Sequence, residues 1–250
     1  MADAASAIPA LRRALAPDAE SKALARFAKD PQLVREMDAF AKAAAKATDV
    51  KAALRDPKIL NVLLPALGLP DAVGQPGLAL RALTADPKQA DGLLSRLSDS
   101  RWKAAAATLN LRERGVAALR DPKVQASLAD GLRRMAWKNE LDAGQPGVGD
   151  ALLFRDRASA ATNAYAVLGD PVLRRVVTTA LGLPQAIVVQ PVETQARAIT
   201  ARLDLAKLQD PREVAKLAER YVVAAAGSGG TAAGASSPLL SLVPAGGLLA

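Results

Sequence analysis

Apolar residues recur at intervals of three or four positions along most of the chain, as in Leu33, Met37 and Phe40, with polar residues between them. This spacing places apolar side chains on one face of an α-helix. Only residues 186–189 form a short apolar run that looks like a strand, and this run lies between Pro184 and Pro191. The pattern therefore predicts an all-α protein.

Asp-Pro pairs indicate where several of these helices begin. An Asp carboxylate accepts a hydrogen bond from a backbone N–H of the first turn, which has no partner within the helix. Pro suits the next position because the N–H that it lacks is not needed there. Six starts are predicted, at Asp30/Pro31, Asp56/Pro57, Asp86/Pro87, Asp121/Pro122, Asp170/Pro171 and Asp210/Pro211.

Glycines predict where two of the helices end. The helices that start at Asp56 and Asp170 are each followed by a Gly just beyond the last turn, Gly68 and Gly182. The remaining helices are expected from the spacing of apolar residues and from the caps. Their approximate ranges are 9–27, 30–46, 77–83, 86–97, 99–109, 121–141, 148–156, 158–168, 192–203 and 211–225.

The two halves of the chain are related in sequence. Residues 56–70 and 170–184 are identical at 8 of 15 positions without a gap, and residues 86–97 resemble 210–221 more weakly. Three capped helices recur in the same order, which favours an internal duplication, although any Leu- and Ala-rich helix with an Asp cap would share part of this pattern. We expect an N-terminal segment with the first helix, two related multi-helix halves and a flexible C-terminal tail, over residues 1–24, 25–111, 116–226 and 227–250.

Composition excludes several kinds of chemistry. The chain has neither His nor Cys, which rules out disulfides, thiolate nucleophiles, Ser-His-Asp triads and imidazole metal ligands. No Gly-rich phosphate-binding loop and no calcium-binding loop is present. We therefore expect no catalytic residue, no metal and no cofactor, and a protein that is not an enzyme.

The C-terminal segment differs in composition from the rest of the chain. Residues 227–237 are almost entirely Gly, Ser and Ala, which predicts a flexible linker, and residues 238–250 form an uncharged apolar tip. Such a tip is expected either to fold into a groove of its own chain or to bind a partner. The expected partner-binding residues are Leu239, Leu240, Leu242, Val243, Leu248 and Leu249.

The formal charge of +8 leaves nucleic acid as an alternative partner. Pairs of neighbouring arginines would contact phosphates, but they are spread over separate segments with acidic neighbours, so solvated helix faces explain them better. The pairs are Arg12/Arg13, Arg112/Arg114, Arg133/Arg134, Arg155/Arg157 and Arg174/Arg175. No apolar run is long enough to span a membrane, and the N-terminus lacks the features of a cleavable signal peptide, which predicts a cytoplasmic or flagellum-associated location.

The order of these features resembles a bacterial family known as domain of unknown function twelve-seventeen, often encoded beside flagellar genes in alphaproteobacteria. The features run from the helix at Asp30 to the tail around Pro238. In the first half they are the segment at Asp49, the helix end at Leu67-Gly68-Leu69, and the residues Asp99, Arg101 and Trp102. In the second half they are Phe154, Arg155, Leu168, Gly169 and Gln195. The chain departs from its relatives by carrying alanines around 43–47 and 104–107, where they favour aromatic and charged residues.

The resemblance implies a function but transfers no catalytic residue, because none is known for the family. It implies a non-enzymatic, flagellum-associated structural, assembly or export-linked protein whose partners are flagellar components. The expected mechanism is protein–protein contact through the apolar tip or an exposed helix face, driven by burial of apolar surface. A basic helical nucleic-acid-binding protein is the alternative.

Overall fold

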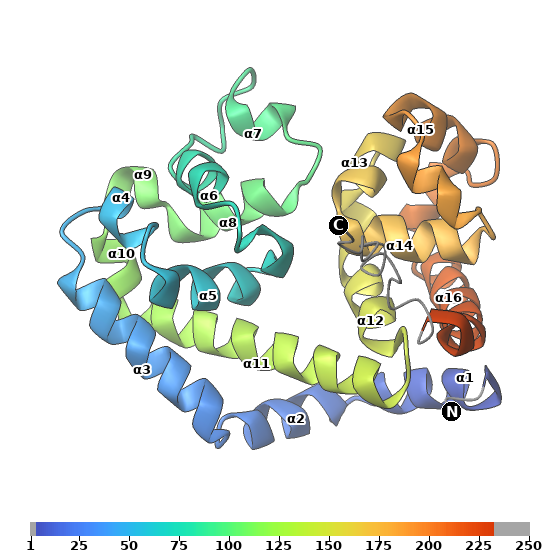
Figure 1. Cartoon of the computed structure of the whole chain (residues 1–250), viewed down its shortest axis with the longest axis horizontal. Coiled ribbons are helices and arrows are strands. Elements are labelled where there is room, and N and C mark those ends of the chain that lie inside the picture. The colour runs from blue at the N-terminus through green and yellow to red at the C-terminus, as the bar shows by residue number, and fades with distance from the viewer. Residues whose placement is uncertain (1–3, 233–250) are drawn as a thin grey trace, which may run out of the picture.

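The computed structural model describes residues 4–232, and within this range the chain is helical and contains no strand (Figure 1). The all-α prediction is confirmed. The helices of the first part of the chain are α1 (Ala4–Ala14), α2 (Ala19–Phe27), α3 (Pro31–Lys46), α4 (Val50–Ala53), α5 (Pro57–Ala66), η1 (Pro70–Ala72), α6 (Pro76–Leu83), α7 (Leu93–Arg96), α8 (Arg101–Leu109), α9 (Leu111–Arg114), α10 (Ala117–Arg120) and α11 (Pro122–Gly144). Those of the second part are α12 (Val148–Arg157), η2 (Ala158–Ala160), α13 (Ala164–Gly169), α14 (Pro171–Ala180), η3 (Gln185–Val189), α15 (Val192–Thr200), η4 (Leu205–Gln209) and α16 (Pro211–Ala232).

Five of the six Asp-Pro pairs open α-helices, as predicted. In each of them the Asp carboxylate accepts a hydrogen bond from a backbone N–H of the first turn at 2.8 Å. The five capping residues are Asp30, Asp56, Asp121, Asp170 and Asp210. The hydrogen bonds predicted from residue type alone therefore form.

The prediction of a helix over 86–97 is wrong. The Asp86 carboxylate accepts a hydrogen bond from the Lys88 N–H at 2.9 Å, but residues 86–92 form turns, and only α7 follows. Residues 88–91 are polar or small and exposed, so a helix here would gain almost no apolar burial, and Gly92 disfavours it further. A capping residue alone did not produce a helix.

The predicted glycine stops are confirmed, and the two are built alike. Gly68 and Gly182 have φ values of +75° and +62°, in the left-handed region. In the first stop the Gly68 N–H donates to Pro65 O at 2.9 Å and the Leu69 N–H to Leu64 O at 2.8 Å. The second stop repeats both bonds at the same spacing, from Gly182 to Thr179 and from Leu183 to Thr178. The sequence match between 56–70 and 170–184 thus corresponds to the same local structure.

Several other predicted boundaries differ from the structure. The expected helix over 158–168 is the short 3₁₀-helix η2 followed, after a break at 161–163, by α13. The expected helix over 9–27 is two helices, and Pro9 lies inside α1 rather than at its start. The run 186–189, which looked like a strand, lies in the 3₁₀-helix η3. It is flanked by prolines, and the described part of the chain has no strand with which it could form a sheet. Helix α16 continues to Ala232, into the segment predicted as a linker from residue 227.

The buried apolar residues form two clusters. One cluster draws its members from residues 40–132 and the other from residues 7–23 and 137–226. We call the corresponding parts the first lobe and the second lobe. Helix α11 contributes Leu128 and Leu132 to the first lobe and Trp137 to the second, and α1 packs on α16 in the second lobe. Figure 1 shows α11 running from one lobe to the other.

The predicted division into halves at 25–111 and 116–226 remains a prediction about sequence duplication. The clusters divide the chain within α11, a helix that the lobes share. No helix in residues 4–232 has both the length and the apolar character needed to cross a lipid bilayer.

Candidate functional site

The junction between the lobes begins at the end of α5. The left-handed Gly68 terminates this helix, and the Gly68 carbonyl oxygen accepts hydrogen bonds from Arg101 Nη1 at 2.7 Å and Arg157 Nη2 at 3.3 Å. Arg101 is the first residue of α8 in the first lobe, and Arg157 is the last residue of α12 in the second lobe. One backbone carbonyl therefore connects both lobes.

Arg101 is the centre of a buried ion-pair network. Its side chain is only 7% exposed, and its guanidinium donates to Asp71 at 2.9 and 3.0 Å and to Asp99 at 2.8 and 2.9 Å. Burial alone would lower the pKa of Arg101, but the two carboxylates raise it overall. Burial alone would likewise raise the pKa of Asp71, and Arg101 holds that pKa below its usual range. Arg101 and Asp71 therefore stay charged at neutral pH.

Asp170 carries the network into the second lobe. Its carboxylate caps α14 through the N–H of Val172 and lies 3.6 Å from Arg101 Nε and 3.2 Å from Arg157 Nη1. Asp170 is almost fully buried. Asp170 of the predicted helix start thus has a second role, because it also forms ion pairs with two arginines from different helices.

The backbones of the two lobes also meet directly beside this network. A Cβ atom at Gly169 would lie 2.6 Å from Ser98 C and 2.8 Å from Asp99 N, so only glycine allows this approach. Within the first lobe, next to Gly68, a Cβ atom at Gly131 of α11 would lie 2.1 Å from Ala66 O at the end of α5. Two glycines therefore permit the close packing that brings the charged side chains together.

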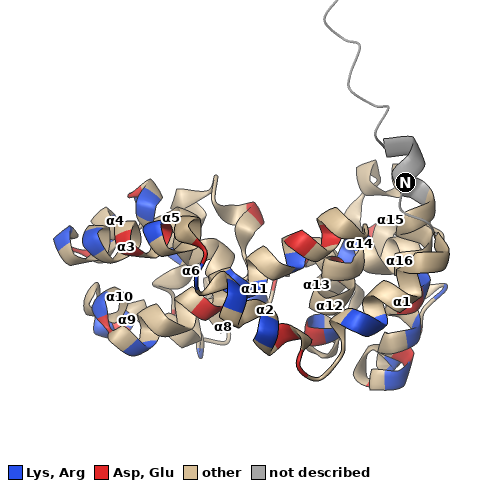
Figure 2. Cartoon of the chain, turned by 90° about the horizontal axis from the view of Figure 1, so that it is seen from below, with Lys and Arg blue, Asp and Glu red and all other residues tan. Residues whose placement is uncertain are grey.

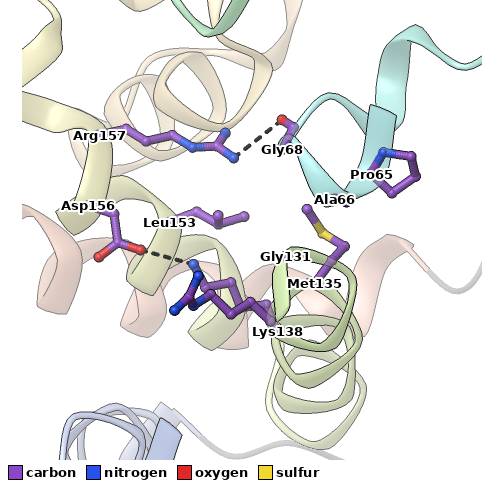
Figure 3. Close-up of a pocket in the computed structure, with 10 residues that line it drawn as sticks. Pro65, Ala66, Gly68, Gly131, Met135, Lys138, Leu153, Asp156 and Arg157 are labelled. Carbon is purple, nitrogen blue, oxygen red and sulfur yellow. Dashed lines mark hydrogen bonds and ion pairs between the residues drawn. The ribbon is translucent and has the colours of Figure 1, made fainter. Parts of the chain in front are cut away.

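A cavity of about 190 Å³ lies at this junction (Figure 3). Its lining is partly apolar and partly charged, and it consists of Pro65, Ala66, Gly68, Gly131, Arg134, Met135, Lys138, Leu153, Asp156 and Arg157. The charged groups are engaged with one another or with neighbours. Lys138 Nζ lies 2.9 Å from Asp156 Oδ2, Arg134 pairs with Glu20, and Arg157 contacts Gly68 and Asp170. Among these contacts, the bond from Arg157 to the Gly68 carbonyl joins the two lobes.

A second charged cluster lies within the second lobe, where α12 begins. The Asp150 carboxylate accepts hydrogen bonds from Arg175 at 2.5 and 2.7 Å and from the Tyr221 hydroxyl at 2.8 Å. Burial and the neighbouring Asp150 raise the pKa of Tyr221, and the bond to Asp150 raises that of Arg175. Asp142, at the end of α11, accepts a hydrogen bond from the Gly149 N–H at 2.8 Å.

Asp142 gives the protein a predicted pH dependence. Burial, followed by repulsion from Asp150, raises the pKa of Asp142 to about 6. Because this pKa lies above that of the unfolded chain, the folded state binds the proton more tightly, and stability contributed by Asp142 increases as the pH falls from 7 towards 4. We expect Asp142→Asn to be more stable than the native protein at pH 7, with the difference shrinking at pH 5. Urea unfolding at the two pH values measures this, and an equal difference at both would contradict the assignment.

An exposed apolar surface lies between α14 and α15. Val188 and Val189 of η3 are 53% and 79% exposed, and Val192 at the start of α15 is 44% exposed. We call these three residues the valine surface. No charged residue occurs from 176 to 192 in the sequence, and the Gln195 side chain fixes this segment by donating to the carbonyls of Val188 and Gln190. The valine surface is therefore held in place while it faces solvent.

The predicted tip residues Leu239, Leu240, Leu242, Val243, Leu248 and Leu249 lie outside the described residues. Sequence reasoning missed the Arg101 network, because Arg101 resembles any arginine in a first helical turn and its partners other than Asp99 are distant in the chain. It noticed residues 186–189 as an apolar run but assigned no function to them. That run was the available signal for the valine surface.

The fold and the junction define the class: an all-α, two-lobed protein whose buried charges join its lobes. Residues 66–214, more than half of the chain, match a family described as a protein of unknown function, DUF1217, and the chain belongs to this family. The predicted resemblance is thus confirmed. No curated protein matches the chain.

A solved structure has a similar fold. It is the X-ray crystal structure of a protein from Agrobacterium tumefaciens, produced by a structural genomics consortium. The two chains are 24% identical, with a TM-score of 0.69, and the match covers 90% of this chain and 95% of the other. At this identity the likeness concerns the fold, and both lobes are part of it.

Proposed function

We propose that this protein is a non-enzymatic, flagellum-associated structural, assembly or export-linked component that acts by protein–protein contact. The observation that carries the proposal is the valine surface: three exposed, uncharged branched side chains held on a folded frame. Exposed apolar groups that are fixed in position mark contact surfaces more often than single scattered ones do. The partner should present an apolar, uncharged surface to them.

The charged residues of the described part support a contact function over chemistry. The sequence contains ten arginines that occur next to or near another arginine, and seven of these ten form ion pairs with carboxylates. The seven arginines are spread over several helices: Arg12, Arg112, Arg114, Arg133, Arg134, Arg157 and Arg175. Figure 2 shows basic and acidic residues intermixed over both lobes. Neutralised, scattered arginines are less suited to a phosphate backbone than a continuous basic face. This favours a protein partner over nucleic acid.

Within residues 4–232, no group of three or more acidic side chains is arranged to hold a metal ion. The flagellar part of the proposal rests on the family resemblance.

The apolar tip at 238–250 offers a second apolar, uncharged contact surface like the valine surface.

Co-purification tests the proposal. A tagged full-length chain should recover flagellar components from motile cells, and replacing Val188, Val189 and Val192 by Ser should reduce the recovered amount at least tenfold, because apolar burial would be lost. Val34→Ser is the control, since Val34 on α3 in the first lobe is a valine as exposed as Val192, at 44%. The amount recovered by a chain that lacks residues 238–250 shows how much of the binding is due to the tip. Equal recovery by the native chain, the triple variant and the tip deletion would refute the contact mechanism.

A further inference from the structure

The N-terminal helices leave an apolar groove where they cross the second lobe. The groove has a volume of about 370 Å³ and lies between α1, α2, the end of α11 and the start of α12. Its apolar walls include Ala10 and Ala14 of α1, and Trp137 and Leu141 of α11. The volume falls within the range of about 300–1,000 Å³ that is typical of ligand pockets. The groove thus has room for several apolar side chains.

One polar group of the groove wall lacks a partner. The Gln145 side chain accepts a hydrogen bond from Ser6 Oγ at 2.9 Å through Oε1, but its Nε2 amide is buried without a hydrogen-bond acceptor. Gln145 is more than nine-tenths buried, and it lines the groove. A buried donor without an acceptor is costly, and by turning towards the groove the Gln145 side chain would find an acceptor on the backbone of a bound peptide. The groove therefore fits a peptide with apolar side chains.

The C-terminal half of α16 passes beside this groove at Tyr221 and Ala225. A Cβ atom at Gly147 would touch Ala225 at 2.9 Å and Tyr221 at 3.0 Å, and Gly147 lies between Gln145 and Val148, which both line the groove. From Ala225 to the end of α16 at Ala232 the helix rises by about 10 Å. Residues 233–238 in an extended conformation span about 20 Å, which is enough to return to the groove.

We propose that the apolar tip of this same chain, residues 238–250, docks in this groove. The side chains of the tip carry no charge, and its five leucines match the apolar walls of the groove: Leu239, Leu240, Leu242, Leu248 and Leu249. When the Gln145 side chain turns towards the groove, a backbone carbonyl of the tip gives its amide an acceptor. This docking is a property of the free protein, so it does not depend on the identity of any partner or on the flagellar assignment.

The absence of cysteine allows a direct test on the full-length chain. A variant with Ala10→Cys in the groove and Leu242→Cys in the tip is oxidised under mild conditions at low protein concentration. An intramolecular disulfide should form at least tenfold faster than in the control pair Ala224→Cys with Leu242→Cys. Ala224 is exposed on α16 and closer to the tip along the chain, but it does not line the groove.

A second groove position guards against a folding defect in the first variant. Ala19→Cys at the start of α2 should give the same preference over Ala224→Cys. Replacing Leu239, Leu240, Leu248 and Leu249 by Ser should remove the preference for either groove position. Equal rates for the groove and control pairs would overturn the proposal. Disulfide-linked dimers whose yield rises with protein concentration, without the intramolecular product, would also overturn it and assign the groove to the tip of a second copy.

Discussion

Replacing Arg101 by Met is expected to lower the free energy of unfolding by about 3–5 kcal/mol, because removal of one member of a buried ion network leaves its partners charged and unpaired. Asp71 and Asp99 would each lose both of their bonds to the guanidinium, and Asp170, whose side chain is 4% exposed, would keep Arg157 as its only ion-pair partner beside its helix-capping bonds. Met fills a similar volume, so the loss would reflect the charge. Urea denaturation followed by far-UV circular dichroism measures it.

Arg26→Met is the matched control for this prediction. Arg26 also forms a two-bond ion pair, with Glu140, but its side chain is 58% exposed. Exposed pairs contribute about 0–1 kcal/mol, because water already solvates both charges. If the two substitutions destabilise the protein equally, the buried network does not hold the lobes together in the way described.

Replacing Gly131 by Ala is expected to destabilise the protein by about 2–3 kcal/mol, although Ala is the better helix former. The new Cβ atom would lie 2.1 Å from the Ala66 carbonyl oxygen, which is backbone and can yield only if α5 moves away from α11. That movement would also shift Gly68 and its hydrogen bonds to the two arginines. The same unfolding measurement detects the effect.

Gly144→Ala, in the same helix, separates this steric effect from helix propensity. No atom lies within 4 Å of a Cβ built at Gly144, so this variant should be neutral or more stable by up to about 1 kcal/mol. A stabilised Gly131→Ala variant would show that α5 and α11 do not approach each other as closely as described.

The sequence was most informative where structure depends on local hydrogen bonds. The caps at Asp30, Asp56, Asp121 and Asp170 and the stop at Gly68 each involve groups only a few residues apart, so residue type suffices to predict them. The helix expected after Asp86 failed because a helix also needs apolar surface to bury, and residues 88–91 provide almost none.

Prediction also failed where packing between distant elements decides the outcome. Pro9 lies within α1, whose residues Ala7, Leu11 and Ala14 are buried against the second lobe, and that burial offsets the hydrogen bond that Pro cannot make. The hydrogen bond from Arg157 to Gly68 joins residues 89 positions apart, and no local pattern connects them. The junction could be recognised only once α5, α8 and α12 were placed together.

Swimming motility most directly tests the central claim that the protein acts through an exposed apolar contact surface. Cells that lack the gene receive the native chain, the triple Ser variant at Val188, Val189 and Val192, or the Val34→Ser control, all at matched protein levels. We predict that the native chain and the control restore swimming and that the triple variant does not. Full restoration of swimming by the triple variant would contradict the claim.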